Sequence, residues 1–394
     1  MTDLVALVWG DAYQQALYDF GSTHPLQPIR VQLAVELMRA CGLLTAPGVL
    51  VLDPRLATVQ ELRGVHHPAY VDAVQTLSAA GYDAHELTDL ARQFGFGSSD
   101  NPVFANMHEA SALVAGGTVV GAEAIMSGQV QHAFVPAGGL HHAHHARAAG
   151  FCIYNDPAVA IAAVRARYDC RVVYIDVDAH HGDGVEEIFY KDPQVLTISM
   201  HESGRHLFPG TGFVEDLGAG AGRGFAVNVP LEPYTTDAPF LRVLDEVVVP
   251  LVRAFKPDLL VTQCGCDSHW DDPLTHLATS TRIWPVLTHT FHDLAHDQCQ
   301  GRWLATGGGG YDLYSVVPRA WTILFAGMVG VELPTRLPEQ FLALRRQYTD
   351  EPLEEHFLDA EAAPIAPERQ QAIEAVTQRT INRVLETIFP LIIA

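Results

Sequence analysis

The chain has 394 residues, of which 48% are hydrophobic and only 18% charged, so it has the composition of a protein with a large buried core and not of a disordered one. Its formal net charge of −22 argues against a nucleic-acid partner, because proteins that bind phosphate backbones carry clustered positive charge. The acidity either favours cationic partners, such as lysine- and arginine-rich protein segments, or only confers solubility.

The first 130 residues are predicted to be mainly helical. Segments 28–44 and 57–77 have apolar residues at helical spacing, and Thr58 with Glu61 forms a capping-box pattern at the start of a helix. The N-terminus has no basic region followed by a sustained apolar run, and no stretch approaches the roughly 18 uninterrupted apolar residues of a membrane span. Six scattered cysteines without a CxxC pair fit reduced thiols, so we expect a cytoplasmic protein with no membrane partner.

From residue 132 onwards, strand-like apolar runs alternate with helix-like runs. Strands are predicted at 132–136, 171–178, 195–200, 224–230, 258–264 and 302–307, and helices at 157–168, 184–192, 237–255, 280–298 and 313–328. Continuous apolar strands separated by helices indicate a parallel sheet covered on both faces. The predicted class is therefore α/β with a single sheet, and the tail ends in a further helix over 367–392.

The stretch YIDVDAHHGDG (174–184) predicts a metal site. Side chains alternate along a strand, so Asp176 and Asp178 share one face, and buried carboxylates need a cation nearby. Asp178 and His180 lie where the strand ends, and Asp267, after the strand 258–264, is the best third ligand. Two carboxylates and one imidazole suit Zn²⁺ or Fe²⁺ and leave positions open for water and substrate. The alternative is that the aspartates are helix caps or salt-bridge partners.

Two further motifs follow predicted strands. His141 and His142, in GGLHHAHH, are suited to act as base and acid near neutral pH, and Asp176 and Asp183 are available to set their tautomers. A minority alternative is an incidental histidine-rich metal-binding loop. In TGGGGYD (306–312), the glycines fit neither a Walker loop nor a dinucleotide fingerprint, so we expect them to let the backbone approach a narrow pocket. Tyr311 would then hydrogen-bond a developing oxyanion.

These motifs resemble the signature blocks of histone deacetylases, in particular the class I enzymes and the bacterial acetoin-utilization deacetylases. The blocks are STHPLQPIR (22–30), GGLHHA (138–143), GFCIYND (150–156), YIDVDAHHGDGVEEIFY (174–190), FPGTG (208–212), QCGCDS (263–268) and GGGGYD (307–312). The resemblance spans residues 20 to about 330 and implies the arginase/deacetylase fold, with a central parallel sheet of about eight strands. We predict one domain over 1–394, with this core and a C-terminal helical extension over about 335–394.

The resemblance also implies a role for each matching residue. Zinc ligands would be Asp178, His180 and Asp267; catalytic residues would be His142 as general base, His141 as its electrostatic partner, Asp176 and Asp183 as their carboxylates, and Tyr311 to polarise the acetyl carbonyl. Substrate-binding residues would be Asp100, Gly150, Phe151, Phe208 and Leu274, and Arg30 would line an acetate-exit channel. A potassium ion would be held by Asp176, Asp178, His180, Ser199 and Met200.

The predicted function is zinc-dependent hydrolysis of the acetyl amide of acetyl-lysine in proteins or peptides. An alternative on the same site is hydrolysis of acetylpolyamines or other small molecules. An arginase-like enzyme with two Mn²⁺ ions would use the spacing DxHxD, whereas here Asp183 lies one position further on. A non-catalytic scaffold is the third alternative. The physiological substrate, the native metal and the oligomeric state cannot be read from the sequence.

Overall fold

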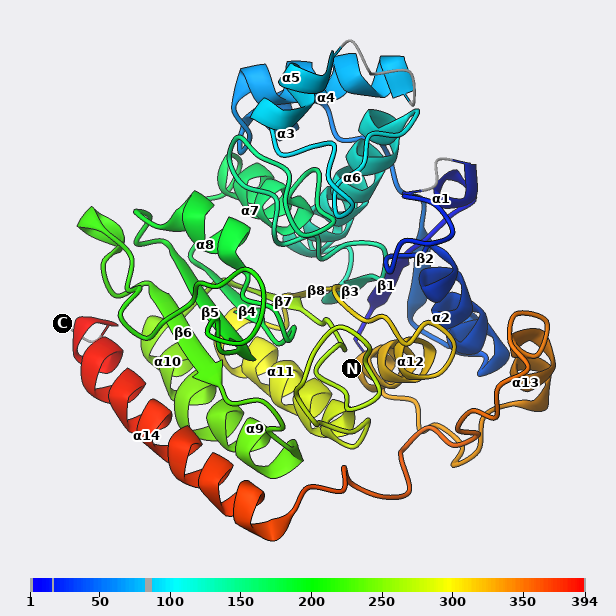
Figure 1. Cartoon of the computed structure of the whole chain (residues 1–394), viewed down its shortest axis with the longest axis vertical. Helices are drawn as coiled ribbons and strands as arrows, with labels where there is room; N and C mark the ends of the chain where they lie inside the picture. Colours follow the sequence, from blue (N-terminus) through cyan, green and yellow to red (C-terminus); the bar gives the residue numbers. More distant parts are fainter. Residues whose placement is uncertain (1–2, 16–17, 82–86, 393–394) are drawn as a thin grey trace.

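A sheet of eight parallel strands runs through the middle of the computed structural model, which describes residues 3–15, 18–81 and 87–392 (Figure 1). The strand order is β2-β1-β3-β8-β7-β4-β5-β6. The strands are β1 (Val5–Val8), β2 (Val49–Leu52), β3 (His132–Val135), β4 (Val172–Asp176), β5 (Val195–Glu202), β6 (Ala226–Leu231), β7 (Leu259–Gln263) and β8 (Trp303–Thr306). The α/β class and the six predicted strands are confirmed.

The first 130 residues are mainly helical, as predicted, but they also contain two strands, β1 and β2, that were not predicted. Each is a run of only four apolar residues. A continuous apolar run of this length shows neither the two-residue period of a strand nor the 3.6-residue period of a helix, so its pattern does not tell the two apart. β1 lies inside the sheet between β2 and β3, while β2 is an edge strand whose residues are partly exposed. The capping box at Thr58 and Glu61 is confirmed at the start of α3.

Helices cover both faces of the sheet (Figure 1). On one face, α6 and α7 pack over strand side chains such as Ala133 and Tyr174, and α4 and α3 pack on the outside of α6 and α7; on the other face, α2, α9 to α12 and α14 cover strand side chains such as Phe134 and Ile175. The helices are α1 (Ala12–Gln15), α2 (Ile29–Ala40), α3 (Val59–Arg63), α4 (Pro68–Ala80), α5 (Thr88–Gln93), α6 (Met107–Met126), α7 (Asp156–Arg165), α8 (Asp183–Phe189), α9 (Asp237–Val243), α10 (Val249–Phe255), α11 (Ile283–Cys299), α12 (Val316–Val329), α13 (Glu339–Arg345) and α14 (Pro367–Ile392).

Helix α6 is apolar and 20 residues long, enough by length and composition to cross a membrane. Of its most apolar stretch, 78% is buried inside the protein, against α7 and the sheet. This burial is what a core helix of an α/β domain shows.

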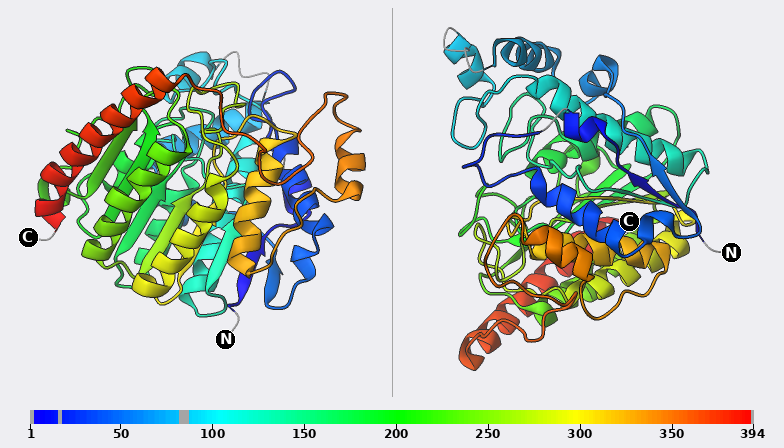
Figure 2. Two further views of the ribbon diagram at one scale, coloured as in Figure 1. Left: turned by 90° about the horizontal axis from the view of Figure 1, so that it is seen from below. Right: turned by 90° about the vertical axis from the view of Figure 1, so that its right-hand side faces the viewer.

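The C-terminal helix α14 lies against β6, α9 and α10, along the outside of the molecule (Figure 2). Its buried residues, Ile373, Thr377, Ile381, Val384 and Ile388, recur every three or four positions and form one apolar stripe. Arg242 of α9 also donates a hydrogen bond to Gln378, at 2.8 Å. These contacts support a single domain over 1–394, which stays a prediction.

A buried ion pair fixes the segment between α13 and α14. The Asp359 carboxylate accepts hydrogen bonds from Arg319 Nη1 at 2.7 Å, from His269 Nε2 at 2.8 Å and from the Thr281 backbone amide at 2.7 Å. Arg319 is 1% exposed and Asp359 6%. Burial opposes ionisation of Asp359, but the His269 and Arg319 partners outweigh it and lower the pKa of the carboxyl below its usual range.

We expect Asp359→Asn to lower the free energy of unfolding by about 3 kcal/mol near pH 7, because the change leaves the Arg319 charge buried without its partner. The native carboxyl has a lowered pKa, so its contribution is complete above the unfolded pKa of about 3.9 and is lost as the pH falls below it. Urea denaturation near pH 7 and near pH 3 should therefore show a large difference from wild type that shrinks in acid. The control is Asp350→Asn, which alters an exposed aspartate of the same tail; equal destabilisation by both changes would contradict the assignment.

Candidate active site

The predicted site residues converge at the carboxyl ends of four neighbouring strands, β3, β8, β7 and β4. Loops that leave parallel strands at this edge bring distant parts of a chain together, and active sites of α/β folds form there. β3 is followed by His141 and His142, β8 by Tyr311, β7 by Asp267, and β4 by Asp178 and His180. The adjacency of these strands, which no local pattern encodes, is what assembles the site.

Asp178, His180 and Asp267 form a compact group of donor atoms. His180 Nδ1 lies 3.1 Å from Asp178 Oδ1 and 2.8 Å from Asp267 Oδ2, and one ligand atom from each residue lies within 4.8 Å of the others. Both carboxylates are fully buried, and His180 is 7% exposed. Two carboxylates and one imidazole at this spacing are suited to one divalent transition-metal ion.

Backbone and amide groups hold the two carboxylates in place. Asp178 Oδ2 accepts hydrogen bonds from Gln263 Nε2 at 2.7 Å and from the Gly309 amide at 2.6 Å, and Asp267 Oδ1 accepts one from the Ala179 amide at 2.7 Å. A Cβ atom on Gly309 would lie 2.1 Å from Asp267 Oδ2, so only glycine allows this approach. The glycine run thus brings the backbone against the site, as the sequence predicted.

The charge balance of this group calls for a cation. Burial, and then the neighbouring Asp178 carboxylate, raise the pKa of Asp267 to about 8. Two carboxylates in a buried site cannot both remain ionised unless a positive charge compensates them. The donor set therefore fits a bound divalent ion.

His141 and His142 each hydrogen-bond a carboxylate, as predicted. His141 Nδ1 lies 2.8 Å from Asp176 Oδ2, His142 Nδ1 lies 2.7 Å from Asp183 Oδ1, and the two Nε2 atoms are 3.1 Å apart. Burial opposes the charge on His141, but Asp176 and Asp178 outweigh it and raise its pKa to about 9. Burial and then the His141 charge lower the pKa of His142 to about 4. The two neighbouring histidines thus have pKa values shifted in opposite directions.

Two residues that the sequence reasoning missed hold the histidine loop. The Asp156 carboxylate accepts hydrogen bonds from the Gly139 amide at 3.0 Å and the Leu140 amide at 2.7 Å. Asn155 donates to the carbonyls of His141 and Ala143, at 3.0 and 2.9 Å. Both residues stand in the quoted block GFCIYND, so the signal was present, but their partners could be identified only in three dimensions.

Aromatic rings flank the site. The Phe208 ring lies 5.0 Å from the His142 ring and 6.5 Å from the His180 ring, and Phe151 lies 5.8 Å from Tyr311, measured between centroids. Phe208 is 44% exposed, so it lies on the side of the site that faces solvent. A Cβ atom on Gly150 would lie 2.3 Å from His142 Cδ2, which explains the glycine there.

Asp272 is another residue that the sequence reasoning missed. Its carboxylate accepts hydrogen bonds from the backbone amides of Tyr311, at 2.8 Å, and Leu274, at 2.9 Å. It thus ties the loop after β8 to the loop after β7. Among the described residues, Tyr311 makes its hydrogen bond through the backbone amide, which leaves its hydroxyl available to a substrate.

Comparison with known proteins identifies the family. The sequence profile described as "Histone deacetylase domain" matches residues 24–328. The chain is 40% identical to the acetoin utilization protein AcuC of Bacillus subtilis over 382 residues, which cover 97% of this chain and 96% of the relative. It is 38% identical to AcuC of Staphylococcus xylosus, over 93% of this chain and 94% of that one.

The chain belongs to the histone deacetylase family.

Solved structures agree with this assignment. The crystal structure of an HDAC homologue from Aquifex aeolicus superposes with a TM-score of 0.81 at 30% identity, over 95% of this chain and 99% of that one. An HDAC homologue complexed with SAHA gives a TM-score of 0.81 at 29% identity, over 96% and 100% of the two chains. The arginase/deacetylase fold implied by the sequence is confirmed, and the protein is a hydrolase of the deacetylase type.

The remaining predicted residues of this histone deacetylase-family site lie around the same edge. Asp100 is exposed, and its carbonyl lies 3.3 Å from His24 Nε2, while Leu274 is partly exposed beside Asp272. Arg30 is buried and donates hydrogen bonds to the carbonyls of Gly308 and Gly310, at 2.7 and 3.0 Å. Ser199 pairs with Asp176 in the β4–β5 register, and Met200 follows it. The roles assigned to these residues stay predictions.

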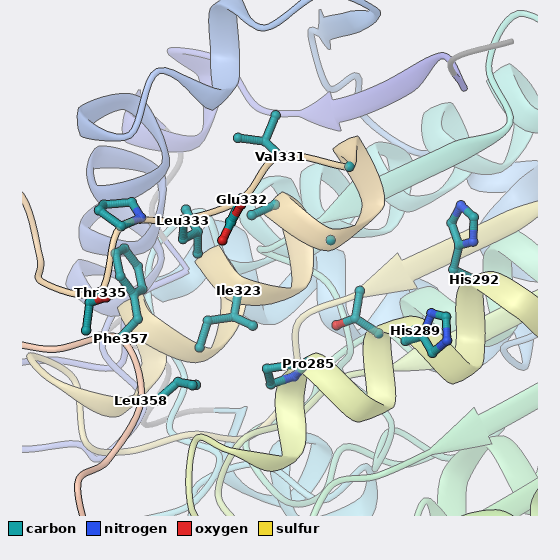
Figure 3. A pocket seen from close by; sticks show the side chains of 15 residues that line it. Pro285, His289, His292, Ile323, Val331, Glu332, Leu333, Thr335, Phe357 and Leu358 are labelled. Atoms are coloured by element: carbon teal, nitrogen blue, oxygen red, sulfur yellow. The ribbon is translucent and has the colours of Figure 1, made fainter.

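A separate pocket of about 590 Å³ lies between α11, α12 and the tail (Figure 3). Its lining is mostly apolar and includes Ile323, Val331, Leu333 and Phe357. It contains none of the predicted site residues, so the chemistry of the family is assigned to the edge formed by β3, β8, β7 and β4.

Proposed function

We propose that this hydrolase removes the acetyl group from acetyl-lysine side chains of proteins or peptides, as a zinc-dependent deacetylase of the cytoplasm. The observation that carries the proposal is the meeting of three groups at one sheet edge: a buried donor triad, the His142–Asp183 pair and the free Tyr311 hydroxyl. Amide hydrolysis needs an activated water, a proton donor for the leaving amine and a group that stabilises an oxyanion. Six free cysteines are in keeping with a reducing compartment.

Zn²⁺ would be held by Asp178, His180 and Asp267, and Fe²⁺ fits the same donors. When bound, the ion would supply Lewis-acid polarisation of the acetyl carbonyl and of a water molecule. Three protein ligands leave room in the coordination sphere for substrate, which is typical of catalytic and not of structural sites. A nearby K⁺, held by Asp176 and Ser199 together with the backbone of Asp178, His180 and Met200, is proposed by resemblance.

His142 would act as base and then as acid. Its Nδ1 faces Asp183 at 2.7 Å, so that nitrogen carries the proton and Nε2 is left with the free electron pair. The lowered pKa keeps the ring neutral, which a base must be before it accepts a proton from the attacking water. The same proton would then pass from Nε2 to the departing lysine amine.

His141 and Tyr311 would stabilise negative charge around the reacting carbon. Asp176 binds His141 Nδ1 at 2.8 Å and raises the pKa of His141, whose Nε2 lies 3.1 Å from His142 Nε2. The Tyr311 ring is fixed by its backbone hydrogen bond to Asp272 and by its edge-to-face contact with Phe151. Its hydroxyl would donate a hydrogen bond to the oxyanion as the acetyl carbon becomes tetrahedral. Arg30, beneath the glycine loop, would guide the acetate product away.

Two aromatic rings beside the site support a lysine side chain as the substrate group. Phe151 and Phe208 offer apolar ring surface to the aliphatic stem of acetyl-lysine. Exposed Asp100 at the rim is placed to accept hydrogen bonds from a peptide backbone.

We expect the zinc-loaded protein to hydrolyse an acetyl-lysine peptide with a kcat/KM at least tenfold above that for acetylspermidine, a margin of about 1.4 kcal/mol in transition-state binding. Steady-state kinetics on both substrates, after removal of metal with a chelator and reloading, measure this ratio. A preference for acetylspermidine would replace the proposed substrate by the small-molecule class. No hydrolysis of either substrate by the metal-loaded protein would overturn the mechanism.

A further inference from the structure

A second cluster of metal-ligating side chains lies at the opposite edge of the sheet from the active site. Asp3 precedes β1, His132 is the first residue of β3, and His292 and His296 lie on α11. One ligand atom from each of the four lies within 4.8 Å of the others. His132 and the catalytic His141 are thus at opposite ends of the strand β3 and its loop.

Three distances in this cluster are those expected between neighbouring ligands of a tetrahedral metal site. Asp3 Oδ2 lies 3.5 Å from His132 Nε2, 3.3 Å from His292 Nε2 and 3.1 Å from His296 Nε2. Zinc–nitrogen and zinc–oxygen bonds of about 2.1 Å in a tetrahedron place neighbouring ligand atoms about 3.4 Å apart. The three distances therefore agree with four ligands around one small ion.

A buried imidazole without a hydrogen bond points independently to a ligand. His132 is completely buried, and among the described residues neither of its ring nitrogens has a hydrogen-bond partner. Its neighbours are the rings of His292, His296 and Trp303, at centroid distances of 5.1, 5.4 and 5.5 Å. Leaving a buried polar group unsatisfied costs about 1–3 kcal/mol, and a bound ion is one of the few explanations for such a group in a folded protein.

The fold holds these four residues together without a metal. The Leu4 carbonyl accepts a hydrogen bond from the Gln131 backbone amide at 2.9 Å, and the Leu4 amide donates one to Gln131 Oε1 at 2.8 Å, which places Asp3 beside His132. His292 and His296 are four residues apart, so they face the same side of α11. Their side chains are 32% and 38% exposed, which gives an ion access from solvent.

We propose that Asp3, His132, His292 and His296 bind one divalent transition-metal ion of the Zn²⁺ type. Three neutral imidazoles and one carboxylate are borderline ligands, which favour Zn²⁺, Co²⁺ or Ni²⁺ over Mg²⁺ or Ca²⁺. Four protein ligands fill a tetrahedral shell, so the site is structural and fastens the start of the chain to β3 and α11. The assignment does not depend on the metal or the substrate of the active site.

The test counts ions on untagged, full-length protein. After chelator treatment and equilibrium dialysis against Zn²⁺, elemental analysis should find one bound ion fewer per chain in His292→Ala/His296→Ala than in wild type. Loss of these ligands should weaken binding at the cluster at least roughly 100-fold, because even supporting residues around a metal site contribute 10- to 100-fold. Both histidines are partly exposed, so the variant avoids the buried His132.

The matched control is His289→Ala, on the same helix but 79% exposed and outside the cluster. It should bind as many ions as wild type. Co²⁺ loading gives a second measurement: wild type and His289→Ala should show a tetrahedral visible absorption that the double variant has lost in part. Equal ion counts in wild type and in the double variant would overturn the proposal, whatever the activity of the three proteins.

Discussion

His142→Ala lowers kcat for acetyl-lysine hydrolysis by roughly 10²- to 10⁴-fold, the range expected when a positioned general base and acid is lost. The lowered pKa of His142 favours its neutral ring, and Asp183 binds Nδ1. Nε2 is therefore the ring nitrogen that can accept a proton from the attacking water. The metal content should equal that of wild type, because His142 is not among the three donors. Steady-state kinetics and elemental analysis on the same preparation check both statements.

The matched control is His145→Ala, in the same histidine-rich tract. His145 is exposed and its ring hydrogen-bonds the Val65 carbonyl, away from the site. We expect its kcat to stay within about threefold of wild type, as for other surface changes. A His142→Ala protein with full metal and wild-type kcat would remove His142 from the mechanism.

Tyr311→Phe lowers kcat and kcat/KM together, by roughly 10²- to 10³-fold. The hydroxyl makes no hydrogen bond to the described residues, so its deletion leaves no buried partner unsatisfied. The ring stays in place because Asp272 holds the backbone amide of residue 311 and not the hydroxyl. An equal fall in both constants is the signature of an interaction made only in the transition state.

Metal content and melting temperature should be unchanged in this variant. Tyr314→Phe is the control, since it removes a hydroxyl three residues later, from a ring packed against the core. A rise in KM with kcat preserved would show instead that Tyr311 contributes ordinary substrate binding.

The convergence of the proposed site residues could be predicted because each of them follows a strand whose apolar run is visible in the sequence. Asp178 and His180 lie two residues apart, and the histidines 141 and 142 are adjacent, so the local pattern already carries the chemistry. The supporting residues could not be predicted in the same way. The Gly309 amide that holds Asp178 is 131 residues away from it in the chain, and no local signal pairs an amide with a carboxylate at that separation.

The second cluster escaped prediction for a related reason. Asp3 and His296 are 293 residues apart, and Asp3 stands before β1, a strand that the sequence reasoning read as part of a helical region. Once β1 lies beside β3 in the sheet, Asp3 and His132 become neighbours automatically. Because β1 was not predicted as a strand, the four side chains of this cluster could not be recognised as neighbours from the sequence.

The glycine loop beneath the active site also bears on how such enzymes can diverge. Within this loop, Gly309 donates its main-chain amide to Asp178, and a methyl group at Gly309 would collide with the carboxylates of both Asp178 and Asp267. A substitution at Gly309 would therefore displace the carboxylates of Asp178 and Asp267. Changes in acyl or peptide preference are therefore expected at outward positions, such as the exposed Phe208 and the partly exposed Leu274. Substitutions there leave the buried residues of the site in place.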